Sequence, residues 1–184
     1  MTNATDGVQY LLPNGDSAGL MYLGGGSNRW KTVYGVNAYN ASSDRREKTD
    51  ISPFSGGLLD AWEGIDWVQF HRIEAVEREG AAHARFHAGL IAQDVESALA
   101  AFGIDASGYG FFCHDFWDAE EAYDGSRGGE PHPAREAGDA YSLRYEEALC
   151  IEAAYMRREN ARLKKRVADL EERLAALELR LGSE

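Results

Sequence analysis

A heptad repeat of apolar residues near the C-terminus constrains the fold more than any other feature of this sequence. Its members recur in alternating steps of four and three, and only one of them is polar: Leu149, Ala153, Met156, Asn160, Leu163, Val167, Leu170, Leu174, Leu177 and Leu181. Side chains with this spacing line one stripe of an α-helix, which is buried when the helix winds around others. We therefore predict that residues 146–184 form a coiled-coil helix, in which the roughly 35 residues from Leu149 onward make a rod of about 50 Å.

Charges beside this seam indicate how the helices associate. With Leu163 as a d residue, the g and following e positions are opposite in charge in each of the pairs Glu159–Lys164, Arg166–Glu171 and Arg173–Glu178. Such pairs favour parallel strands in register, and Asn160 at an a position penalises slipped registers. Leucine at both a and d leaves the strand number open. Residues 166–171 and 173–178 resemble a signature of short parallel trimers, which favours three strands. Ten seam positions with only one polar residue argue against the alternative, a long helix packed on its own domain.

Composition excludes several classes of partner. The 184 residues carry a net charge of −12, which argues against a nucleic-acid backbone or an anionic membrane as the main partner. Cys113 and Cys150 are too few for a disulfide or zinc framework, so free thiols in a reducing compartment are expected. The local set Cys113, His114, Asp115 and Asp118 fits no standard zinc spacing. We expect neither a metal nor a cofactor.

The N-terminal segment predicts short strands. Two apolar stretches, residues 8–12 and 19–23, are separated and followed by glycine-containing turns. Residues 1–42 lack the apolar mass to fold alone, and their pattern suits a fibrous β-structure in which three chains bury each other's faces. A frayed tail with one hairpin is the alternative for residues 1–18.

The middle of the chain predicts a small α+β unit. In order, we expect an amphipathic helix within 54–68, a strand at 66–73, a turn at 80–82, a partner strand at 84–90 and a helix from 91 to about 103. Ile91, Val95, Ala98 and Leu99 should face inward in that last helix. Residues 105–140 are too apolar for a linker, although a mobile loop is expected at 125–138.

A polar stretch between these segments pairs a hydroxyl with an amine, Ser43 with Lys48. A serine is a poor nucleophile until a base takes its proton, and a lysine is such a base only where burial or another cation keeps it neutral. Five residues span about 140° of helical turn, so the side chains would converge only in a strand or a turn. Taken alone, a solvated polar turn is the simpler interpretation.

Four segments together carry a resemblance to a known family. Ser43-Asp44-x-x-x-Lys48-x-x-Ile51 resembles the opening of the intramolecular chaperone domain at the C-terminus of phage tail spikes and tail fibres, the endosialidase-type or S74 peptidase family. Residues 28–34 resemble its last fibre segment, 87–96 its H-x-G-x-I-A-Q-E-V core, and 141–149 the start of its final helix. The resemblance implies a fibre or spike end at 1–42, an α+β chaperone domain at 43–145 and a trimerisation helix at 146–184.

The resemblance also implies a self-cleaving serine peptidase that acts once. The Ser43 hydroxyl would attack the carbonyl group of Ser42, with Lys48 as general base, and cut the bond between these two serines. His87 would orient that carbonyl group or stabilise the oxyanion, and a hydrogen-bonded core histidine is the alternative. Asp44 would position Lys48 or the new amine, or equally serve as a turn residue.

A homotrimer that folds the preceding fibre segment in the host cytoplasm, and leaves that segment in the virion tail, is therefore the expected function. The first alternative is a permanent trimeric fibre tip or adhesin without proteolysis. The second is a hydrolase of other substrates, but the sequence has no HExxH or phosphate-loop motif. The third, a coiled coil that recruits another protein, is disfavoured by the self-complementary seam.

Overall fold

The computed structural model describes residues 2–3, 10–11, 42–123 and 133–181, and the chain divides into two compact units. One comprises Met1–Ser42 and Asp115–Ala140, and the other Ser43–His114 and Tyr141–Glu184. In the first, β1 (Thr2–Asn3) pairs antiparallel with β2 (Tyr10–Leu11). β2 lies within the predicted strand at 8–12, whereas β1 was not expected and the predicted strand at 19–23 lies outside the described residues.

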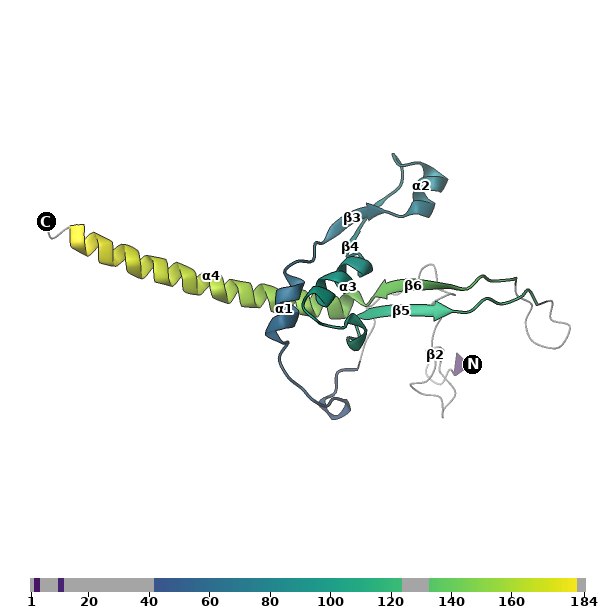
Figure 1. Ribbon diagram of the computed structural model, residues 1–184, viewed down its shortest axis with the longest axis horizontal. Helices are drawn as coiled ribbons and strands as arrows, with labels where there is room; N and C mark the ends of the chain where they lie inside the picture. Colours follow the sequence, from purple (N-terminus) through teal and green to yellow (C-terminus); the bar gives the residue numbers. More distant parts are fainter. Residues whose placement is uncertain (1, 4–9, 12–41, 124–132, 182–184) are drawn as a thin grey trace. The chain divides into compact units, whose positions relative to one another are not determined.

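The core of the second unit forms where two short helices meet the beginning of a long one. α1 (Gly56–Trp62) packs against both α3 (Ala92–Ala101) and the first turns of α4 (Tyr145–Leu181) (Figure 1). The most deeply buried large side chains come from these helices and from the residue preceding β5: Leu58, Trp62, Val95, Leu99 and Phe111. The mixed α and β composition of this unit confirms the α+β part of the predicted fold class.

The predicted helices at 54–68 and 91–103 are confirmed with shorter bounds. Ser55 is the N-cap of α1, and its hydroxyl accepts a hydrogen bond of 3.2 Å from the Leu58 amide. Val95 and Leu99 face the core as expected. Ile91 does not, and its side chain is 39% exposed. It precedes α3 as its N-cap with extended backbone, so the helical periodicity does not reach it.

Polar contacts fix α1 to α4. The Arg158 guanidinium donates a hydrogen bond of 2.6 Å to Asp60 and further ones to two backbone carbonyls of α1. Trp62 and Trp67 both donate their indole N–H groups to one carboxylate oxygen of Glu152, at 2.8 and 3.2 Å. The beginning of α4 is therefore part of the folded domain.

Between α1 and α3 the chain forms an arm of two strands and a helix. β3 (Val68–His71) pairs antiparallel with β4 (Phe86–Gly89), which confirms the predicted hairpin. Its connection is not the simple turn that was expected, because α2 (Ile73–Glu79) fills most of it. α2 escaped prediction because its seven residues bury no side chain and so give no apolar periodicity. Gly80, with φ of 78°, ends it.

A third two-stranded sheet corrects the expectation for residues 105–140, where no strand was predicted. β5 (Phe112–Trp117) and β6 (Gly138–Leu143) run in opposite directions side by side (Figure 1). Their connection is longer than the two to five residues of a recognisable hairpin turn. Part of the loop predicted at 125–138 lies outside the described residues, and within the rest Arg135 pairs with Glu120 through backbone hydrogen bonds and a 3.2 Å ion pair.

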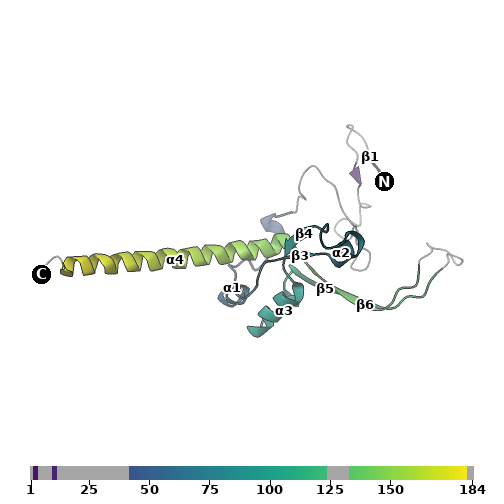
Figure 2. The same cartoon turned by 90° about the horizontal axis from the view of Figure 1, so that it is seen from above.

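The distal part of α4 is a single uninterrupted helix (Figure 2). All its residues from 160 to 181 are exposed. They include the apolar members of the heptad repeat Leu163, Val167, Leu170, Leu174, Leu177 and Leu181. The described part of the chain therefore leaves this stripe uncovered, while the coiled coil itself stays a prediction.

None of the helices in the described ranges is long and apolar enough to span a membrane.

Candidate active site

Ser43 and Lys48 meet across a tight turn. Between them lies η2 (Arg45–Glu47), a 3-10 turn in which the Lys48 amide donates a hydrogen bond of 3.2 Å to the Arg45 carbonyl. The turn reverses the chain, and the Lys48 side chain donates a hydrogen bond of 2.8 Å to the Ser43 hydroxyl oxygen. The two side chains thus converge in a turn, one of the two conformations in which the sequence allowed this.

Asp44 starts this turn rather than contacting the lysine. Its carboxylate accepts a 2.9 Å hydrogen bond from the Arg46 amide and three of 2.6–3.1 Å from the Arg46 guanidinium. The guanidinium bonds, and then the amide bond, lower the pKa of Asp44 below its ordinary value. Of the two predicted roles, these contacts match the turn residue.

The Ser43–Lys48 pair is exposed to solvent in the single chain, as is Ser42. Ser42 precedes the pair directly, so its carbonyl group belongs to the peptide bond that the Ser43 nitrogen completes. The arrangement brings together a hydroxyl, an amine and an adjacent carbonyl group. What it lacks is the burial that a lysine needs to act as a base.

His87 lies on β4, directly opposite Phe70 in the β3–β4 register. The two rings stack with centroids 5.9 Å apart and an interplanar angle of 23°. His87 is exposed, so the alternative of a buried, hydrogen-bonded histidine is wrong. Within the described part of the chain, it makes no hydrogen bond to Ser43 or Lys48. Its part in cleavage stays a prediction.

Gly89 and Tyr145 anchor the end of β4, and sequence analysis gave neither of them a role. The Tyr145 hydroxyl accepts a hydrogen bond of 3.2 Å from the Leu90 amide and donates one of 3.4 Å to its carbonyl oxygen. A Cβ atom at Gly89 would lie only 2.2 Å from this hydroxyl oxygen. A glycine inside a strand often marks a place where another group approaches the backbone closely. The glycine of the H-x-G motif was therefore a signal in the sequence for this contact.

Gly89→Ala should lower the free energy of unfolding by about 1–3 kcal/mol, because the new methyl group forces Tyr145 away from Leu90. The matched control is Gly57→Ala in α1, where a Cβ atom meets nothing within 4 Å and the loss of glycine flexibility is stabilising. Chemical denaturation of both variants measures the difference. Equal unfolding midpoints would contradict the close packing at Gly89.

No group of three or more His, Cys, Asp or Glu residues in the described ranges could hold a metal ion. Cys113 is half-buried and Cys150 exposed, both as free thiols.

Comparisons with known proteins identify the class of this domain. The family model described as chaperone of endosialidase, Peptidase_S74, matches residues 43–104, from Ser43 to three residues beyond the end of α3. A solved structure described as a novel intramolecular chaperone is 41% identical, with a TM-score of 0.58, and the match covers 65% of this chain and 99% of that one. The chain therefore belongs to the endosialidase-type chaperone family, the S74 peptidases.

Relatives within this class come from phages, and two of the three named here are tail proteins. The carboxy-terminal domain of the bacteriophage T5 L-shaped tail fibre, solved with its intramolecular chaperone domain, has a TM-score of 0.66 and 28% identity over 87% of this chain and 39% of that one. The tail spike protein of Escherichia virus K5 is 42% identical over 86% of this chain. Capsule K3-specific depolymerase 1 of Klebsiella phage KP32 is 36% identical over 74%. The chain spans only 24% and 13% of the last two proteins.

Proposed function

We propose that this chain is a self-releasing intramolecular chaperone of a phage tail fibre or spike. Residues 146–184 join three copies, residues 43–145 fold the fibre segment that ends at residue 42, and the bond between Ser42 and Ser43 is then cut. The observation that carries this proposal is the 2.8 Å hydrogen bond between Lys48 and the Ser43 hydroxyl, at the start of the family match. Assembly takes place in the host cytoplasm, and the N-terminal product remains in the virion tail.

Trimerisation would help the strands of three chains to pair in the correct register in a fibrous β-structure. Non-local strand pairing is slow, and strands that pair out of register aggregate. A coiled coil at the chain ends holds three copies at high effective concentration before the fibre forms. The uncovered apolar stripe of α4 supports this role, because burying one leucine side chain contributes about 1.5–3 kcal/mol.

The cut is an acyl shift followed by hydrolysis. Lys48, in its neutral form, takes the proton from the Ser43 hydroxyl, and the oxygen attacks the carbonyl carbon of Ser42. A carbon–oxygen bond forms, the carbon–nitrogen bond breaks, and the Ser43 nitrogen receives the proton as it becomes a free amine. Water then hydrolyses the ester, which leaves a carboxylate on Ser42 and restores the Ser43 hydroxyl.

The timing of this reaction follows from solvent exposure. In the single chain both side chains of the Ser43–Lys48 pair are exposed to water. Assembly with the fibre and neighbouring copies would exclude this water, and the cleavage reaction could then begin. Once the chaperone has left, the fibre is kinetically trapped, because the template that guided its assembly is gone.

Intact mass spectrometry and N-terminal sequencing of the folded protein test the proposal. We expect two products, residues 1–42 and 43–184, with Ser43 as the new N-terminal residue of the larger one. A trimer whose chains all have the full-length mass would instead favour the permanent fibre tip. A cut at another bond would remove Ser43 from the role of nucleophile.

A further inference from the structure

One face of the β3–β4 arm gathers positive charge. Arg72 directly follows β3 and Arg85 directly precedes β4, and both line one pocket together with His87 of β4. Phe70 and His87 are paired in the register and their rings stack, so these two side chains share one face of the hairpin. His71 takes the opposite face.

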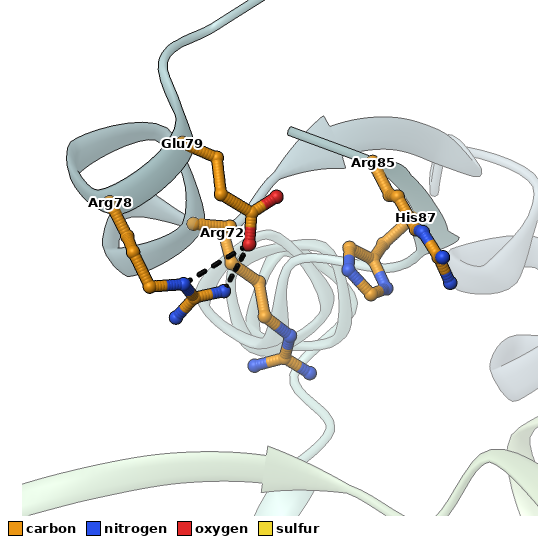
Figure 3. Close-up of a pocket in the computed structure, with 6 residues that line it drawn as sticks. Arg72, Arg78, Glu79, Arg85 and His87 are labelled. Atoms are coloured by element: carbon orange, nitrogen blue, oxygen red, sulfur yellow. Dashed lines mark hydrogen bonds and ion pairs between the residues drawn. The ribbon is translucent and has the colours of Figure 1, made fainter. Parts of the chain in front are cut away.

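α2 and the adjoining ends of the two strands line an open pocket of about 320 Å³ (Figure 3). Its lining consists of Arg72, Ala75, Arg78, Glu79, Arg85 and His87. This volume is at the lower end of the range of small-molecule sites. All of these residues except Ala75 are exposed, so a ligand can reach the pocket directly from solvent.

Two of the three guanidinium groups in this pocket are uncompensated. Arg78 is bound to the Glu79 carboxylate at 2.5 and 3.1 Å, so these two charges offset each other. Neither Arg72 nor Arg85 has an ion pair or a side-chain hydrogen bond in the part of the chain that the structure describes. In a chain of net charge −12, a pocket that concentrates unpaired cations is poised for an anion.

We propose that this pocket binds an oxyanion, a carboxylate or phosphate group, through the guanidinium groups of Arg72 and Arg85. A planar guanidinium donates two parallel hydrogen bonds to such a group, and two of them outweigh the single carboxylate already present. His87, beside Arg85, contacts the same ligand. The group comes either from a free anion or from an acidic side chain of a second copy. This site depends on neither the proposed cut nor the proposed coiled coil.

The test uses the full chain carrying Ser43→Ala and follows its histidine ring signals by NMR during titration with inorganic phosphate. Chloride at matched ionic strength is the reference, and His87→Gln identifies the His87 signal. We expect a saturable shift with phosphate and not with chloride, and at least a fivefold weaker affinity in Arg72→Gln or Arg85→Gln. Arg157→Gln, an exposed arginine on α4, should leave the affinity unchanged.

Dilution distinguishes the two sources of the oxyanion. In one outcome, the His87 signal shifts further as the protein concentration rises without phosphate, and added phosphate reverses that shift. This result would show that a carboxylate of a second copy occupies the pocket. A shift that needs added phosphate assigns it to a free anion. Arg72→Lys and Arg85→Lys keep the charge and should retain weakened binding, even where a glutamine variant fails to fold. The absence of a saturable shift in both series, or an unchanged affinity in both glutamine variants, would overturn the proposal.

Discussion

Ser43→Ala should leave the chain at full length under folding conditions in which the wild-type chain separates into two fragments. Without the hydroxyl there is no nucleophile next to the Ser42 carbonyl, and the Lys48 amine loses the oxygen that it contacts at 2.8 Å. Loss of a nucleophile costs roughly a thousandfold or more in rate. For a single-turnover cut, this appears on a denaturing gel as one band instead of two.

Lys48→Met should have the same outcome, because the hydroxyl keeps its proton when the amine is absent. Two neighbouring substitutions serve as controls. Ser42→Ala removes the adjacent hydroxyl, and Arg45→Met removes another exposed cation of the same turn, so both chains should still be cut. Both blocked variants should remain trimers, which separates the chemistry from assembly. Cleavage of the Ser43→Ala chain at the same bond would refute the proposed nucleophile.

Leu170→Asp should convert the trimer to monomers. Leu170 is a d residue of the heptad repeat, 52% exposed on a stretch of α4 that touches no other part of its described chain. In a trimer the substitution would remove three buried leucines, at about 1.5–3 kcal/mol each, and add three like charges to the seam. Sedimentation velocity at micromolar concentration measures the change. Because the cut is proposed to await assembly, fragment formation should fall with the trimer.

Leu179→Asp is the matched control. It makes the same chemical change on the same helix, but Leu179 is an f residue outside the seam and is 77% exposed. This variant should sediment as the wild type does. A Leu170→Asp chain that remained trimeric, or a wild-type chain that was monomeric at all concentrations tested, would contradict a seam-driven assembly.

The sequence predicted those features whose signal is local. The helix that buries Val95 and Leu99 and the β3–β4 pairing follow from apolar periodicity. The Ser43–Lys48 spacing excluded a helix and left a strand or a turn, and the structure has the turn. α2 has no buried side chain, and β5 and β6 join across a long connection, so neither gives a local signal. The Gly89–Tyr145 contact joins residues far apart in sequence, and its closeness became visible only in the folded chain.

α4 carries both core residues of the domain and the exposed apolar stripe in one unbroken helix. The direction in which the stripe faces, relative to the domain, is therefore fixed. Ala148 and Ile151 are locked into the domain, and each residue after them advances the direction by about 100°. One residue inserted between Ile151 and Leu163 would swing the stripe by that angle, whereas seven would bring it nearly back into phase. The number of residues between Ile151 and Leu163 therefore sets the rotational position of each domain around the axis of the proposed coiled coil.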